Sequence, residues 1–200
     1  MKFVLATQNP KKKEEMVAIL GDLGVDIVTE EELGIHVEVE ETGKTFGENA
    51  ALKAKAVMEA TGLPAIGDDS GLCVDALKGA PGVYSARYGG PDMDDYGRCK
   101  LILDGLKGET DRRAHFETYI VCAFPNGDWF AAKGECQGSI AFAAMGNNGF
   151  GYDPIFFRTE EQKTFAQMTA AEKAAISHRG NALRSFKTKL EKYLAEHPEG

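Results

Sequence analysis

Apolar and polar positions along the chain alternate between strand-like and helix-like spacing. The apolar run at residues 3–6 predicts a first buried strand, and the turn after it leads into a helix over residues 11–20. Asn9 is a suitable N-cap for that helix, and Pro10 suits the first helical position. A second short strand is expected at residues 25–28. The chain therefore begins with a strand, a helix and a strand.

Capping-box spacing between Thr45 and Glu48 predicts a further helix, which stops at Gly62. The apolar run after it predicts a strand that ends at Asp68. Residues 78–91 are rich in Gly and Pro, and we expect a loop there. The remaining expected elements are a helix over 93–106, a hairpin of strands at 114–123 and 129–137, a glycine-rich loop at 146–153, a capped helix at 169–176 and a last helix at 181–194. Because helices and strands intermix, we predict an α/β fold with a mixed sheet, as a single domain over residues 1–200.

Composition and charge narrow the possible functions. Hydrophobic residues make up 43% of the chain and charged residues 27%, and the net charge of -8 argues against a broad nucleic-acid-binding surface. No apolar stretch approaches the ~20 residues that span a bilayer, so we expect no membrane partner. No C-x-x-C pair occurs, which argues against a zinc site and favours reduced thiols in a cytoplasmic protein; the cysteines are Cys73, Cys99, Cys122 and Cys136.

Two adjacent carboxylates, Asp68 and Asp69, follow the apolar run that begins at Ala65. Two acids at the end of a buried strand repel each other unless a metal ion, a bound cation or a shared proton offsets the repulsion. The pair therefore favours a divalent metal ion and proton transfer. The alternative is a polar strand end at which one of the two side chains caps the next turn.

The turn from Thr7 to Lys12 opens a helix, and free amides at such a helix end bind anions. Lys11, Lys12 and Lys13 oppose the helix dipole, a cost that a bound phosphate would reverse. The alternative is that solvated lysines tolerate a penalty of about 0.3–1 kcal/mol each. The glycines of a Walker A loop are absent from this turn.

Lys53 shares a helix face with Asn49 among small alanines, which is consistent with a side chain in a cleft or with a solvated surface. Upstream, the acidic residues Glu38, Glu40 and Glu41 offer hard oxygen ligands for Mg²⁺ or form an acidic surface loop.

Two segments in the last third of the chain suit recognition of a purine base. Phe150 lies next to Gly151, where an aromatic ring either stacks on a base, worth ~1–3 kcal/mol, or anchors a β-turn in the core. The run from Ser177 to Gly180 supplies an imidazole and an Arg fork, which suit purine edges or phosphates. Its alternative is a helix C-terminus with Gly180 at the C′ position.

These motifs together resemble the inosine triphosphate pyrophosphatase family, whose bacterial members are XTP/dITP diphosphatases. The resemblance rests on residues 6–9 with Lys12, on residues 40–46 and 48–50 with Lys53 and Ala54, and on residues 68–72, 79–88, 149–156 and 177–180, in the family's order. It implies hydrolysis of ITP, dITP and XTP to the monophosphate and pyrophosphate, with Mg²⁺ as cofactor. It also implies a homodimer and an elongated two-lobed fold around a long mixed β-sheet with flanking helices, the nucleotide lying in the cleft between the lobes.

Carried over by position, the resemblance implies that Asp69 is the general base and a metal ligand, with Glu40 as the preferred second ligand and Glu41 as the alternative. The implied phosphate-binding residues are Thr7, Gln8, Asn9, Pro10, Lys11, Lys12 and Lys53. Ser70 would contact the substrate, and Phe150 would stack on the base in a pocket lined by Gly151, Tyr152 and Asp153. The base and phosphate contacts would be completed by Lys173, His178 and Arg179.

Two other functions compete with this one. In the first, a phosphatase releases inorganic phosphate through an aspartyl intermediate, with Asp69 as the nucleophile. In the second, a module binds nucleotide without turnover. Retention of Asp69 and Lys53 beside the Ser177–Gly180 run argues against a pure binder, which needs neither a metal ion nor a base.

Overall fold

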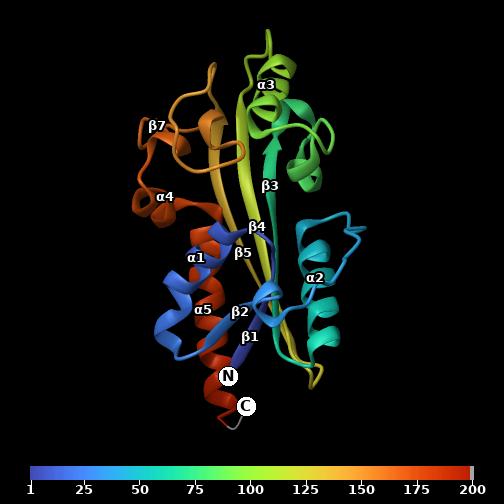
Figure 1. Cartoon of the computed structure of the whole chain (residues 1–200). Helices are drawn as coiled ribbons and strands as arrows, with labels where there is room; N and C mark the ends of the chain where they lie inside the picture. Colours follow the sequence, from blue (N-terminus) through green and yellow to red (C-terminus); the bar gives the residue numbers. More distant parts are fainter. Residues whose placement is uncertain (199–200) are drawn as a thin grey trace. The chain divides into compact units, whose positions relative to one another are not determined.

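The computed structural model describes residues 1–198 and contains one seven-stranded mixed sheet with flanking helices (Figure 1). The strands are β1 (Lys2–Ala6), β2 (Asp26–Thr29), β3 (Ala65–Val74), β4 (Arg113–Ala123), β5 (Trp129–Ile140), β6 (Phe156–Arg158) and β7 (Lys163–Thr164), in the order β2-β1-β3-β4-β5-β6-β7. The helices are α1 (Pro10–Leu20), α2 (Phe46–Thr61), α3 (Asp95–Gly105), α4 (Ala170–Ile176) and α5 (His178–Glu196). β1 pairs in parallel with β2 and β3, whereas β6 pairs antiparallel with β5 and β7. The predicted α/β class with a mixed sheet is confirmed.

The chain divides into two compact units. The first unit comprises Met1–Asp69, Thr118–Gly134 and the residues from Gly180 onward, and the second comprises Ser70–Glu117 and Glu135–Arg179. Strands β3, β4 and β5 contribute residues to both units. Each unit has a hydrophobic core of its own.

The first unit is a three-layer arrangement that follows from the alternation of side chains along β1. Phe3 and Leu5 pack against the apolar faces of α1 and α5, whereas Val4 and Ala6 point to the opposite face, which α2 covers (Figure 1). Gly67 in β3 lets α2 approach closely, because a Cβ atom there would lie 2.4 Å from the Ala50 carbonyl oxygen. The sheet of this unit is therefore buried on both faces.

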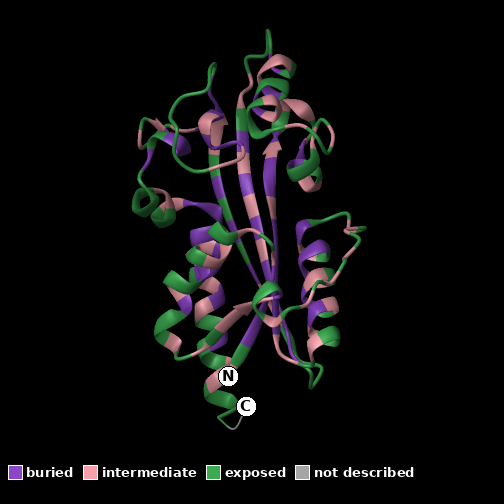
Figure 2. Cartoon of the chain, in the orientation of Figure 1, coloured by how far each residue is buried: buried purple, intermediate pink, exposed green. Residues whose placement is uncertain are grey.

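The core of the second unit lies on one face of its strands and is rich in aromatic rings. Phe116 of β4 packs 4.6 Å from Phe156 and 5.8 Å from Phe165, measured between ring centroids. Buried side chains of α3, Cys99 and Ile102, join this cluster. Along β4, buried residues alternate with half-buried ones as far as Tyr119 (Figure 2). The opposite face of β4 in this unit consequently carries polar residues.

The predicted helix caps are confirmed. The Asn9 side chain accepts a hydrogen bond from the Lys11 amide at the start of α1. Both expected capping boxes are formed, at Thr45 for α2 and at Thr169 for α4. Gly62 ends α2 with a left-handed φ of 67°.

Two expectations are wrong, and one alternative interpretation is excluded. The strand expected to end at Asp68 continues to Val74, because Leu72 and Val74 supply buried positions beyond the acids. The Gly- and Pro-rich loop at 78–91 contains a 3₁₀ helix, Gly82–Arg87. Gly180 is not a C′ residue: α4 ends at Ile176 and α5 begins at His178, so Gly180 lies within a helix.

A search of residues 1–198 for a helix long and apolar enough to cross a membrane finds none.

Candidate functional site

The predicted phosphate turn connects β1 to α1 in the first unit. The Asn9 amide donates a hydrogen bond to Thr7 Oγ1 at 3.2 Å, and Asn9 Oδ1 accepts one from the Lys11 amide at 3.0 Å. Thr7 and Lys12 are partly buried, whereas Gln8, Pro10 and Lys11 are exposed. These hydrogen bonds hold the backbone of the turn in one conformation. They therefore also fix the orientation of the first backbone N–H groups of α1.

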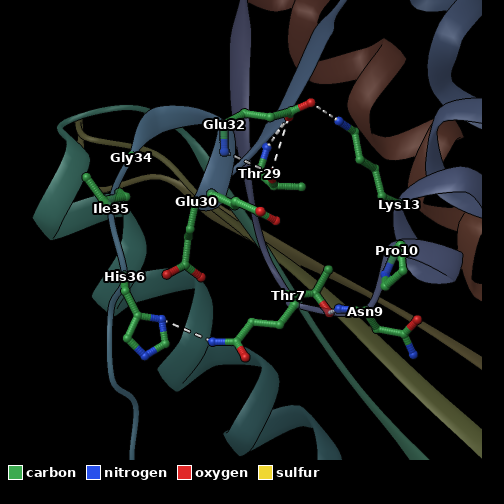
Figure 3. A pocket seen from close by; sticks show the side chains of 12 residues that line it. Thr7, Asn9, Pro10, Lys13, Thr29, Glu30, Glu32, Gly34, Ile35 and His36 are labelled. Carbon is green, nitrogen blue, oxygen red and sulfur yellow. Dashed lines mark hydrogen bonds and ion pairs between the residues drawn. The ribbon is translucent and has the colours of Figure 1, made fainter.

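A pocket of about 850 Å³ opens beside this turn in the first unit (Figure 3). Thr7, Gln8, Asn9 and Pro10 line one side, and residues 29–32 and 34–36 line the other. The Gln8 amide nitrogen lies 3.0 Å from Nδ1 of His36, and Lys13 is neutralised by Glu32 at 2.5 Å (Figure 3). The far wall carries three glutamates, Glu30, Glu31 and Glu32, which disfavour an anion there. This wall of the pocket is therefore unsuited to phosphate groups.

Six charged or polar residues of the first unit form a cluster around Asp69, which we call the acid–lysine cluster: Lys12, Glu41, Asn49, Lys53, Asp68 and Asp69. Lys12 Nζ lies 2.7 Å from Asp68, whose side chain is 1% exposed. Lys53 Nζ lies 3.0 Å from Glu41 and 3.6 Å from Asp69. Two carboxylates thus converge on one cation.

Asn49 positions this cluster from within α2. Its amide nitrogen donates to Asp69 Oδ2 at 3.3 Å, and its oxygen accepts a hydrogen bond from the Gly43 amide at 2.8 Å. Asn49 is buried and lies one helical turn before Lys53, so both side chains reach the end of the cluster that holds Asp69. The sequence placed Asn49 and Lys53 on one helix face but did not assign Asn49 to the site.

Burial raises the pKa of Asp69, and the neighbouring Glu41 carboxylate raises it further, whereas Lys53, Lys12 and the Asn49 amide oppose the shift. The pKa of Lys53 is raised as well: burial lowers it, but the carboxylates of Asp69, Asp68 and Glu41 outweigh burial. A carboxylate with a raised pKa in a partly dry site is suited to taking up a proton.

The two acids that the sequence offered as second metal ligand, Glu40 and Glu41, have different surroundings. Glu41 contacts Lys53 and acts on the pKa of Asp69, whereas Glu40 is exposed. No periodicity defines the register of this acidic run, because it lies in a segment without regular secondary structure. Glu41 therefore shares a contact to Lys53 with Asp69.

The second unit holds a second set of predicted residues around Phe150. Lys173 Nζ lies 2.6 Å from Asp153 Oδ2, and both side chains are largely buried. The same carboxylate oxygen accepts a hydrogen bond from the Phe150 amide at 3.0 Å. Burial raises the pKa of Asp153, while Lys173, the Phe150 amide and Arg179 lower it. The buried acid therefore holds the Phe150 loop and the Lys173 side chain together.

Two cationic side chains lie near the Phe150 ring. Lys173 Nζ lies 4.9 Å from its centroid and the Arg179 guanidinium carbon lies 5.6 Å from it. Arg179 also donates to Ser70 Oγ at 3.2 Å. His178 stacks on Phe116, with 4.5 Å between centroids, and both His178 and Arg179 are buried. Phe150 is only partly buried, unlike the anchored core residue of the alternative interpretation.

Gly149, Gly151 and Tyr152 shape this loop. Gly149 has a φ of 73°, and a Cβ there would lie 2.0 Å from Asp153 Oδ2. The Gly151 amide donates to Asp95 at 2.7 Å, and the Tyr152 hydroxyl donates to the Ser85 carbonyl oxygen at 2.7 Å. Sequence reasoning did not identify Asp95 or Ser85, because both lie more than 50 residues from the loop that they support.

The fold and these two residue sets define an α/β protein that presents a capped turn at the start of a helix, a carboxylate pair and an aromatic ring with cations beside it. Residues 3–189 match the model of the Ham1 family. A dITP/XTP pyrophosphatase of Pectobacterium atrosepticum is 50% identical over 92% of this chain and 94% of its own length. One of Lactiplantibacillus plantarum is 46% identical over 97% and 96%. The Staphylococcus aureus Ham1 protein structure superposes with a TM-score of 0.90 at 41% identity, covering 96% of this chain and 100% of its own.

The chain belongs to the Ham1 family. The resemblance inferred from the sequence motifs is thereby confirmed. The match extends over nearly the whole chain and includes both residue sets described above.

Proposed function

We propose that this protein hydrolyses the non-standard purine nucleoside triphosphates ITP, dITP and XTP to the nucleoside monophosphate and pyrophosphate. The proposal rests on family membership, on the names of its relatives and on one geometric observation. Asp69, a buried carboxylate with a raised pKa, lies beside a second carboxylate and a lysine, at the end of the first-unit portion of β3. Such an enzyme removes deaminated purines from the nucleotide pool.

In this proposal, the first unit supplies the phosphate contacts and the general base. A triphosphate carries about four negative charges, and Lys12, Lys53 and the amides of the α1 turn offer the opposite charge. Asp69 takes the proton from the attacking water. Phosphoryl transfer depends chiefly on positioning and charge stabilisation, so no protein nucleophile is required.

The carboxylates of Asp69 and Glu41 fit a divalent metal ion. Their oxygens lie 3.6 and 3.0 Å from the same cation, Lys53 Nζ, so both carboxylates reach one point in space. Mg²⁺ prefers oxygen ligands of this kind. We propose Asp69 with Glu41 as the Mg²⁺ ligands, in place of the preferred Glu40. When bound, Mg²⁺ would neutralise charge on the phosphates.

The second unit supplies the contacts to the purine base. Phe150 offers a ring face for stacking, and Arg179 and Lys173 offer hydrogen-bond donors beside that ring. The 6-keto oxygen of hypoxanthine or xanthine accepts such a bond, whereas the 6-amino group of adenine leaves the donors unpaired. Asp69 and Ser70 are consecutive in β3, the last residue of one unit and the first of the other.

Matched substitutions test the assignments. Asp69→Asn should retain ITP binding and lose turnover, since the amide cannot accept the proton; near-wild-type turnover would remove Asp69 from its role. Glu41→Gln should raise the Mg²⁺ concentration for half-maximal activity, while Glu40→Gln serves as the neighbouring control. A raised requirement in Glu40→Gln alone would restore the original assignment.

We also propose that the protein acts as a homodimer in the cytoplasm, as the family resemblance implies. Its four cysteines are free thiols, as a reducing compartment would leave them. Light scattering of the purified protein tests the dimer: a mass twice the chain's 21.6 kDa supports it, and a single-chain mass rejects it.

A further inference from the structure

A second group of potential metal ligands lies in the second unit, on residues that the proposed function does not use. His115 and Glu117 lie two positions apart on β4, and Glu135 lies on β5. One ligand atom from each falls within 4.8 Å of the other two, and His115 Nε2 is 3.9 Å from Glu117 Oε2. Ligands on opposite sides of one ion are roughly 4 Å apart at bond lengths of about 2.0–2.2 Å, so small side-chain rotations bring all three to one ion.

The strand pairing explains why these side chains meet. Two backbone hydrogen bonds define the register of β4 with β5, one from Phe124 to Asp128 and one from Ile140 to Arg112. In each pair the two residues lie equally far along the chain from Asn126 in the hairpin turn. Across the same register Tyr119 is opposite Lys133, whose Nζ lies 5.6 Å from the Tyr119 ring centroid.

The same register sets Glu117 directly opposite Glu135. Side chains directly opposite each other on antiparallel strands share one face of the sheet. His115, two residues from Glu117, lies on that face as well. The three ligand side chains are therefore held by paired backbone rather than by a loop.

Two like charges directly opposite each other on neighbouring strands destabilise the pairing. Here the aromatic core lies on the other side of β4. Lys133, two residues along β5 from Glu135, is the nearest cation in sequence. A divalent ion bound between the two glutamates would turn their repulsion into attraction.

We propose that His115, Glu117 and Glu135 form a binding site for a divalent transition-metal ion, with Zn²⁺ as the best-suited member of that class. An imidazole with two carboxylates suits Zn²⁺, whereas Mg²⁺ prefers oxygen ligands alone. The cysteine pattern argued against a zinc site built from thiolates, and this site uses none. With three protein ligands, the ion keeps further positions for water.

The bound ion links β4 to β5 across the face opposite the aromatic core. It therefore stabilises the folded chain in proportion to its occupancy. This effect is independent of ITP turnover, since none of the three residues belongs to the acid–lysine cluster or to the set around Phe150.

Calorimetric titration of the full chain with Zn²⁺, in excess Mg²⁺ to occupy the oxygen-only site, tests the proposal. The wild type should bind one Zn²⁺ per chain through these ligands. His115→Ala, Glu117→Gln and Glu135→Gln should each weaken that binding by at least roughly tenfold, since loss of even an outer-shell partner costs 10–100-fold. His197→Ala is the matched control, because His197 is another partly exposed imidazole with one carboxylate, Asp128, 3.7 Å away.

Thermal unfolding with and without Zn²⁺ provides the second readout. Zn²⁺ should raise the Tm of the wild type and of His197→Ala, and should leave the Tm of Glu117→Gln unchanged. Equal Zn²⁺ affinity in the wild type and His115→Ala, or no bound Zn²⁺ in the wild type, would overturn the proposal.

Discussion

Replacing Gly67 by alanine probes how the fold positions the acid–lysine cluster. A Cβ atom at this position would lie 2.4 Å from the Ala50 carbonyl oxygen and 2.7 Å from the Ala54 nitrogen, both backbone atoms of α2. Neither atom can turn aside as a side chain can, so α2 must retreat from β3 by about 1 Å to restore an ordinary contact of 3.4 Å.

The retreat of α2 carries Asn49 and Lys53 with it. A shift of about 1 Å takes the 3.3 Å hydrogen bond from Asn49 to Asp69 beyond hydrogen-bond range, and lengthens the 3.6 Å contact of Lys53 with Asp69. Overpacking of this kind costs about 1–3 kcal/mol in the free energy of unfolding. A misplacement of about 1 Å in a catalytic set costs up to about 10²-fold in rate.

The assay combines urea unfolding with steady-state hydrolysis of ITP in Mg²⁺. Gly67→Ala should be folded, with a free energy of unfolding reduced by the amount above. Its kcat should fall by more than the fraction of unfolded protein at the assay temperature accounts for. Gly21→Ala is the control, because a Cβ there meets nothing within 4 Å. If Gly67→Ala keeps both the wild-type kcat and the wild-type unfolding free energy, close packing of α2 on β3 does not position the cluster.

Two further predictions concern the second unit. Phe150→Ala should raise the KM for ITP about 5- to 150-fold, the equivalent of ~1–3 kcal/mol of lost stacking, and Phe142→Ala, at an 83% exposed ring, should leave KM unchanged. An unchanged KM in Phe150→Ala would contradict the stacking role. Lys173→Met should cost about 3–5 kcal/mol of unfolding free energy at pH 7, because Asp153 is left buried without its cation. The loss should shrink on acidification, since protonation of Asp153 removes the unpaired charge; a loss independent of pH would contradict this reasoning.

Local sequence patterns predicted the elements that depend on local physics. The N-cap at Asn9 and the capping boxes at Thr45 and Thr169 follow from side chains three or fewer residues away from the amides they satisfy. The end of β3 was misplaced because two adjacent acids resemble a strand terminus, whereas their burial depends on lysines that come from α1 and α2. Likewise, Gly180 resembles a helix stop until the extended backbone at Ser177 is known.

The candidate functional residues also fall into two groups, those found by sequence motifs and those found only by contacts in the folded chain. Asp69, Lys53 and Phe150 belong to motifs that the family resemblance places by position. Glu41, Asn49 and Asp95 depend on contacts across the fold, and sequence spacing alone does not report them. The proposal of Glu41 in place of Glu40 rests on the position of Lys53 in space.

Product analysis after incubation of the purified protein with ITP and Mg²⁺ tests the central claim most directly, with GTP and ATP as parallel substrates. The account predicts IMP and pyrophosphate from ITP, with GTP and ATP nearly untouched. IDP with inorganic phosphate would place the attack at the terminal phosphorus and contradict the account, and ITP binding without any turnover would contradict it as well.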